Sequence, residues 1–206
     1  MLKFEKVLPR ARYGGRLVLA SSSPRRQALM REAGYAFEVM VPKVPEDRLR
    51  IREVRALTES LAYAKARQVA DALVEGVVIG ADTVVAHEGE VIGKPGNDDE
   101  ARMILKRLSG TTHEVITGVC VVNARRGERL LGSDVTRIAM REFSEEDVAE
   151  YVRTGEALGK AGAYAIQENG DRFVERIEGS FTNVVGLPME LLAVLIDAMG
   201  ELIYKD

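Results

Sequence analysis

Residues 77–85 form an apolar stretch with the composition of a β-strand. The segment reads Val-Val-Ile-Gly-Ala-Asp-Thr-Val-Val, so its apolar positions do not alternate with polar ones. A strand that is apolar on both faces is typical of a sheet covered by helices on both sides. The segment therefore predicts an α/β protein and makes Asp82, its one charged residue, conspicuous.

Helical patterns precede and follow this strand. A polar turn after the apolar run 17–20 leads into a helix that ends at Gly34, and a second helix is predicted over 58–74. Asn97 caps a helix that ends before Gly110. Ser144 opens another helix as a capping-box variant, and the last helix is predicted to begin at Pro188.

Strand patterns complete the order. Residues 115–122 and 129–140 predict a long antiparallel pair joined around Arg126 and Gly127. Shorter strands are predicted near 163–167, 173–177 and 182–185. The resulting order is a mixed α/β one, without internal repeats.

Composition narrows the class of protein. A chain of 206 residues with 29 basic and 32 acidic side chains is one domain or two small lobes, with no global basic field for nucleic acid or an anionic membrane. Any anion must therefore be bound by a local cluster. One cysteine and two histidines exclude an internal disulfide and a Cys/His zinc site, and a cytoplasmic location is expected. Residues 1–16, rich in basic side chains and glycine, are predicted to be a loosely attached arm.

The segment after the first strand breaks a local rule. Ser23 as N-cap and Pro24 place Arg25 and Arg26 in the first helical turn, where the helix dipole disfavours cations. Free backbone N–H groups, the Ser21 hydroxyl and two guanidiniums would together bind a phosphate. The alternative is that both arginines are solvated or paired with surface carboxylates.

Asp82 is the second anomaly. A carboxylate inside an apolar strand must be paired, bound to a metal or located where the strand meets solvent; a structural capping role is the alternative. Lys65 in the second helix and Lys94 after the next turn can each direct an ammonium group into the same cleft as Asp82, although isolated lysines are usually solvated.

The small residues of 161–167 are the third feature. They permit close backbone approach, and the donor and acceptor of Gln167 suit a base edge, although tight packing explains the small residues equally well. His87 and His113 are predicted to be surface residues, and Cys120 a buried, inert thiol. The sequence contains no P-loop, dinucleotide-binding or nucleophile-elbow motif.

Together these segments resemble the Maf-like nucleoside triphosphate pyrophosphatases, in family order over about residues 17–200. The matching motifs are Leu19-Ala20-Ser21-Ser22-Ser23-Pro24-Arg25-Arg26, Lys65-Ala66, Gly80-Ala81-Asp82-Thr83, Gly93-Lys94-Pro95, Leu108-Ser109-Gly110, Ala161-Gly162-Ala163-Tyr164 through Gln167, and Gly186-Leu187-Pro188.

The resemblance implies a mixed, elongated, twisted sheet with flanking helices, and two lobes that enclose a cleft. It implies hydrolysis of dTTP and UTP to the monophosphate and pyrophosphate, which cleans the nucleotide pool, with Mg²⁺ or Mn²⁺ as cofactor and a homodimer as the assembly. Asp82 is then the proton acceptor, and Glu46 and Asp82 are the expected metal ligands. The remaining implied substrate-binding residues are Ser21, Arg25, Arg26, Lys65, Thr83, Lys94 and Gln167.

The branch is indicated by the three positions that the resemblance associates with substrate choice. Arg25, Thr83 and Gln167 match the dTTP/UTP branch, whereas the 7-methyl-GTP branch usually has Trp, Gln and Glu there. Phe181 stands where Tyr is commoner, and the arm lies outside the match. Two other readings stay open: a pyrophosphatase for purine nucleotides such as 7-methyl-GTP, ITP or XTP, and a nucleotide-binding regulator of cell division.

Overall fold

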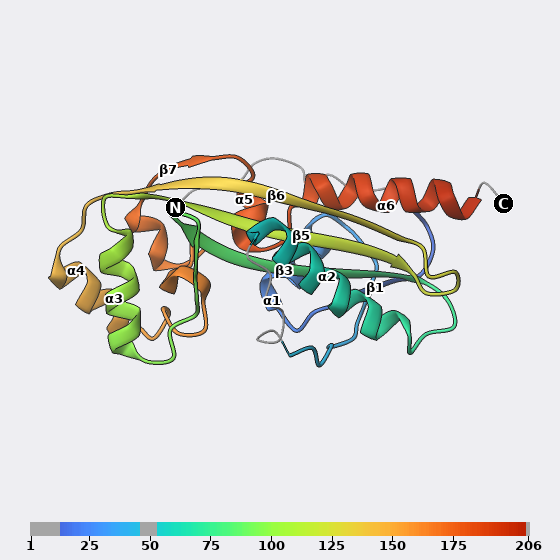
Figure 1. Cartoon of the computed structure of the whole chain (residues 1–206), viewed down its shortest axis with the longest axis horizontal. Coiled ribbons are helices and arrows are strands. Elements are labelled where there is room, and N and C mark those ends of the chain that lie inside the picture. Colours follow the sequence, from blue (N-terminus) through green and yellow to red (C-terminus); the bar gives the residue numbers. More distant parts are fainter. Residues whose placement is uncertain (1–12, 46–52, 205–206) are drawn as a thin grey trace. The chain divides into compact units, whose positions relative to one another are not determined.

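The computed structural model describes residues 13–45 and 53–204 (Figure 1). Its strands are β1 (Leu17–Ala20), β2 (Glu38–Val39), β3 (Val77–His87), β4 (Glu90–Ile92), β5 (Thr112–Asn123), β6 (Arg129–Met140) and β7 (Val174–Glu178). Its α-helices are α1 (Pro24–Glu32), α2 (Val54–Ala70), α3 (Asp98–Leu108), α4 (Glu145–Arg153), α5 (Phe181–Val185) and α6 (Met189–Tyr204). Two 3-10 helices, η2 (Ala161–Ala163) and η3 (Asn169–Phe173), lie between α4 and β7.

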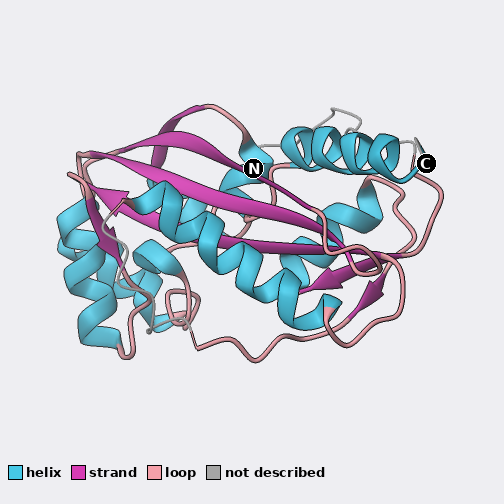
Figure 2. Ribbon diagram, turned by 45° about the vertical axis from the view of Figure 1, so that its right-hand side comes forward, coloured by secondary structure: helices cyan, strands magenta, loops and turns pink. Residues whose placement is uncertain are grey.

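The strands form one seven-stranded mixed sheet in the order β2-β1-β3-β5-β6-β7, with β4 paired to β3. β1 is parallel to both β2 and β3, while β4 and β7 pair antiparallel to β3 and β6. Three of the strands, β3, β5 and β6, have 11 or 12 residues each and are the long strands of Figure 2. The predicted mixed α/β class, with helices flanking a sheet, is confirmed; the cleft stays a prediction.

The chain divides into two compact units. In the described residues, unit 1 comprises Thr83–Ile116 and Val135–Val185, and unit 2 comprises 13–45, 53–82, Thr117–Asp134 and 186–204. The division cuts β3 between Asp82 and Thr83, which are adjacent in the chain. Of the predicted arm, residues 1–12 lie outside the described part.

Helix α2 lies close to the sheet of unit 2 because two strands carry glycine beneath it. A Cβ atom on Gly80 of β3 would collide with the carbonyl oxygen of Ala62 and stand 2.8 Å from the nitrogen of Ala66. A Cβ atom on Gly118 of β5 would stand 2.6 Å from the nitrogen of Glu59. The core under the helix is made of small and medium apolar residues: Val18, Ala20, Ala62, Ala66, Val69, Ala70, Val78, Cys120 and Val122.

Unit 1 has an aromatic core. Helix α3 packs against α4 and η2. Tyr151 of α4 meets Phe173 edge-on at a centroid distance of 5.1 Å, and Phe143 lies 4.5 Å from the same ring. These contacts join α4 to η3 beneath the 161–167 segment, because Phe173 ends η3.

Several predictions from local signals are confirmed. Ser23 caps α1 with Pro24 at its start, Asn97 caps α3, and Ser144 forms a capping box with Asp147 at α4. Burial raises the pKa of the Cys120 thiol to about 12, consistent with an inert thiol. No helix in the described ranges is long and apolar enough to cross a membrane.

Other predictions were wrong in extent or type. Helix α2 starts at Val54 and ends at Ala70 rather than covering 58–74, and the last helix starts at Met189, one residue after Pro188. Neither predicted strand forms: residues 182–185 belong to helix α5, and 163–167 run from the last residue of η2 through irregular backbone into a turn. In both cases short apolar runs have the same composition as strands, and only tertiary packing separates the two.

Candidate active site

In unit 2, Ser21 follows the end of β1 beside the middle of β3, the strand that carries Asp82. Strands β1 and β3 are parallel, with Ala20 opposite Gly80. Ser21 is the first residue after β1, and Asp82 comes two residues after Gly80. β1 ends at Ala20 whereas β3 continues to His87, so Ser21 alone stands at the carboxyl end of its strand, a place where α/β sheets bind ligands. Both residues are buried.

Helix α1 begins at Pro24, three residues after Ser21, and its first turn places Arg26 within hydrogen-bond distance of Ser21. The Ser23 hydroxyl accepts from the nitrogen of Arg26 at 3.4 Å, and the Ser21 hydroxyl accepts from the nitrogen of Ser23 at 3.2 Å. Arg26 Nη1 donates to Ser21 Oγ at 3.3 Å and Nε donates to the carbonyl oxygen of Gly186 at 2.7 Å. The guanidinium is therefore held at the helix N-terminus rather than extended into solvent. Such an arrangement concentrates positive potential where backbone N–H groups are already exposed.

Arg25 completes the start of α1. Its side chain is half-buried, and within the described residues it makes no hydrogen bond or ion pair. Its guanidinium therefore retains its donors for an anion, consistent with the predicted role in substrate binding.

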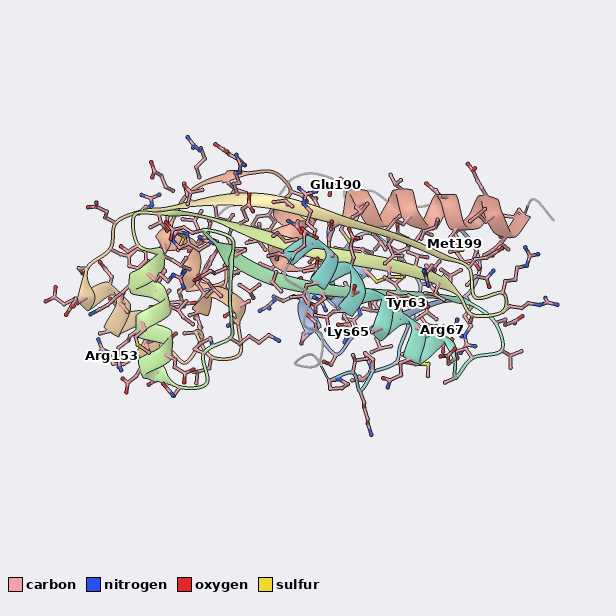
Figure 3. All side chains as sticks on the ribbon, in the orientation of Figure 1. Tyr63, Lys65, Arg67, Arg153, Glu190 and Met199 are labelled. Carbon is pink, nitrogen blue, oxygen red and sulfur yellow. The ribbon has the colours of Figure 1, made fainter. Side chains whose placement is uncertain are left out.

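Lys65 and Asp82 form a buried ion pair. Lys65 Nζ donates to Asp82 Oδ1 at 2.6 Å, and the two side chains are only 11% and 8% exposed. Lys65 lies on α2 (Figure 3), which Gly80 allows to approach β3. Of the alternatives that the sequence left open for Asp82, the structure shows the ion pair, and its partner is Lys65; a role of Lys65 in substrate binding stays a prediction.

Asp82 keeps one oxygen available. No hydrogen bond to Oδ2 occurs within the described part of the chain, so this atom can accept from a water molecule or coordinate a cation. Glu46, the other expected metal ligand, lies outside the described residues. Across the described residues no group of three or more His, Cys, Asp or Glu side chains gathers at one place. One carboxylate together with substrate phosphates is how Mg²⁺ is commonly held, so Asp82 fits a cation that binds with a nucleotide.

Unit 1 carries the other predicted site residues. Thr83 directly follows Asp82 on β3 and is half-buried; Lys94 and Gln167 are exposed. Gly93, which precedes Lys94, accepts from the nitrogen of Gly162 at 3.4 Å. This backbone bond joins the Gly93-Lys94-Pro95 turn to the 161–167 segment, so these two motifs lie together in unit 1.

The 161–167 segment has unusual backbone geometry. Gly162 and Ala163 are consecutive residues with φ of 74° and 59°. Glycine adopts this conformation freely, but for Ala163, which is fully buried, it costs on the order of 1–3 kcal/mol and persists only where the surroundings impose it. The segment is thus held by its neighbours rather than by its own preference.

Both histidines are buried, so their prediction as surface residues was wrong. His113 is 1% exposed on β5, and its Nε2 lies 2.8 Å from the Tyr164 hydroxyl. His87 on β3 places Nδ1 3.2 Å from the carbonyl oxygen of Thr112. The alternation of side chains along a strand could have indicated that His113 is buried, because it lies on the same face of β5 as the buried Val115 and Thr117.

Acid is expected to destabilise the protein through His113. Burial, with a smaller contribution from His87, lowers the pKa of His113 from 6.5 to about 4. The unfolded chain therefore binds a proton between these pH values that the native protein does not, and stability falls as the pH falls. The shift corresponds to about 3 kcal/mol of unfolding free energy, present above pH 6.5 and lost on approaching pH 4. Urea denaturation at pH 7 and pH 4.5 should show a smaller acid loss in His113→Leu than in wild type; equal losses would contradict this assignment.

The chain matches the model of a known family. The family model described as Maf-like protein matches residues 16–199, and the chain belongs to this family.

Individual relatives carry a more specific name. A dTTP/UTP pyrophosphatase of Thermococcus onnurineus is 46% identical over 176 residues, which is 85% of this chain and 94% of the relative. The dTTP/UTP pyrophosphatase of Moorella thermoacetica is 44% identical over 191 residues, covering 90% and 98% of the two chains. That of Ruminiclostridium cellulolyticum is 40% identical over 190 residues, covering 92% and 98%.

Proposed function

We propose that this chain is a nucleoside triphosphate pyrophosphatase that hydrolyses dTTP and UTP to the monophosphate and pyrophosphate. The observation that carries the proposal is the buried Lys65–Asp82 pair on β3, the strand next to β1, whose carboxyl end leads into Ser21 and the arginine-bearing start of α1. A carboxylate beside fixed cations and helix N–H groups suits an anionic substrate that must be attacked by water. The relatives named dTTP/UTP pyrophosphatase support the choice of substrate.

Binding rests on charge. A triphosphate carries about four negative charges, and at an effective dielectric of about 20 a cation at about 4 Å contributes about 4 kcal/mol before desolvation. Arg25, Arg26 and Lys94 supply cations, and the start of α1 supplies backbone N–H donors. Arg26 is already oriented by Ser21 and Gly186, so little side-chain entropy is lost when it meets a phosphate.

Catalysis rests on Asp82. In this mechanism Asp82 Oδ2 accepts a proton from the water that attacks the α-phosphorus. The bond between the α-phosphorus and the oxygen bridging to the β-phosphorus breaks, and the bridging oxygen leaves with pyrophosphate. Lys65 holds Oδ1, which fixes the plane of the carboxylate toward the attacking water. No covalent intermediate is needed.

A divalent cation, Mg²⁺ or Mn²⁺, belongs to the proposal, with Asp82 and Glu46 as its protein ligands. When bound, such a cation neutralises charge on the phosphates and on the departing pyrophosphate. Thr83 and Gln167 are proposed to contact the nucleoside, where an amide supplies both a donor and an acceptor to a pyrimidine edge.

One assay tests this function. The purified chain is incubated with dTTP, UTP, CTP, GTP, ITP, XTP and 7-methyl-GTP, with Mg²⁺, with Mn²⁺ and with EDTA, and the products are separated. We expect dTTP and UTP to give the monophosphate and pyrophosphate fastest, and EDTA to abolish the reaction. Preference for a purine triphosphate would favour the purine-directed alternative, and tight binding without turnover would favour a regulator; either result would overturn the proposal.

A further inference from the structure

The 161–167 segment is held by hydrogen bonds from two buried tyrosines. Tyr164, within the segment, directs its hydroxyl to His113 Nε2 at 2.8 Å, and the two rings meet edge-on at 5.6 Å. Tyr151 of α4 accepts from the nitrogen of Ala165 at 3.2 Å. The neighbouring Gly170 fits so closely that an added Cβ atom would stand 2.7 Å from the carbonyl oxygen of Ala165. These contacts are the surroundings that impose the left-handed conformation on Ala163.

His113 has no other polar role in the described structure. Its second ring nitrogen, Nδ1, is buried without a hydrogen-bond partner. An apolar side chain of similar size would fill the position without leaving a polar atom unpaired, so filling space does not explain a histidine here. What an apolar side chain cannot supply is the hydrogen bond to the Tyr164 hydroxyl.

Gln167 lies three residues beyond Tyr164 in the same turn. Its side chain is exposed and, in the residues that the structure describes, makes no hydrogen bond. The point from which this side chain extends is set by the backbone that carries it, which is anchored at Tyr164 and Ala165. A side chain that reads a base edge needs such a fixed origin, because a small displacement costs the hydrogen bonds that distinguish one base from another.

We propose that His113 is a positioning residue for nucleotide selection: through its hydrogen bond to Tyr164 it fixes the 161–167 segment and thereby the approach of Gln167 to the base. The inference rests on the proposed function. In this inference His113 takes no part in proton transfer, because its Nε2 is occupied by the hydrogen bond to the Tyr164 hydroxyl within unit 1.

The test uses three variants and one control. His113→Leu removes the hydrogen bond and keeps an apolar side chain; Tyr164→Phe removes the same bond from the other side. His113→Gln retains a polar group able to reach the hydroxyl. Ile196→Ala is the control, because Ile196 is a fully buried residue of α6 in unit 2, whereas the segment and its hydrogen-bond partners belong to unit 1; its loss lowers stability without removing a bond to the segment.

Two measurements are made on each protein. Hydrogen exchange without nucleotide reports the amides of 161–167, and steady-state kinetics report kcat and KM for UTP and for GTP. We expect His113→Leu and Tyr164→Phe each to speed exchange of the segment and to lower the UTP preference in kcat/KM about tenfold, mainly through KM for UTP. Their double variant should lose no more than either one, and His113→Gln should recover most of the preference.

The outcomes separate the inference from the function on which it rests. If the wild-type chain releases no pyrophosphate from any nucleotide, the proposed function is wrong. An active wild type in which His113→Leu keeps both the wild-type exchange and the UTP preference overturns the positioning role. A loss of preference of equal size in Ile196→Ala would also overturn it, because the effect would then follow general stability.

Discussion

Asp82→Asn is expected to lower kcat for pyrophosphate release by about 10²–10⁴-fold while nucleotide affinity changes little. The amide cannot take the proton from the attacking water, yet its oxygen still accepts a hydrogen bond from Lys65, so the paired geometry is kept. Turnover of dTTP and UTP, together with equilibrium binding of each nucleotide, measures the two effects separately.

Asp71→Asn is the matched control for that variant. Asp71 follows α2 in the same unit and forms an exposed ion pair with Arg67, so its loss should leave kcat within about twofold. Near-normal turnover in Asp82→Asn would remove Asp82 from the role of proton acceptor. A loss that appeared only as weaker binding would leave the carboxylate with a role in cation or substrate binding alone and would likewise remove it as proton acceptor.

Lys65→Met is expected to lower the free energy of unfolding by about 3–5 kcal/mol at neutral pH. The substitution leaves the Asp82 carboxylate buried in unit 2 without the ammonium that now lies 2.6 Å away. A buried charge without its partner keeps its desolvation cost and loses the attraction that offsets it. Urea denaturation of the two proteins at pH 7 measures the difference.

The exposed Arg67–Asp71 pair provides the comparison. Arg67 lies on the same helix as Lys65 (Figure 3), with both side chains of its pair about half exposed, so Arg67→Met should cost no more than about 1 kcal/mol. Adding Asp82→Asn to Lys65→Met should recover most of the lost stability without restoring turnover, because no buried charge remains. Equal losses for Lys65→Met and Arg67→Met would show that the Lys65–Asp82 pair is screened like a surface pair.

The residues near the start of a helix were sufficient to predict where several helices begin. Ser23, Asn97 and Ser144 accept from backbone nitrogens a few residues ahead, and such interactions are complete within one turn. The end of α2 and the helical state of 181–185 were not predictable in this way. Both depend on what packs against an apolar run, and that partner lies far away in the sequence.

The candidate site shows the same division at the level of side chains. An isolated carboxylate in an apolar strand already marked Asp82 as a residue that is paired, metal-bound or in contact with solvent, and the motifs in their order already indicated the family. Which cation pairs with Asp82 was decided by the fold, because Gly80 lets α2 approach β3 closely enough for Lys65 to reach it. The burial of His113 and its bond to Tyr164 join residues 51 positions apart. Propensity and capping act over a few residues and can be read along the chain, whereas burial and pairing depend on atoms that only the folded chain brings together.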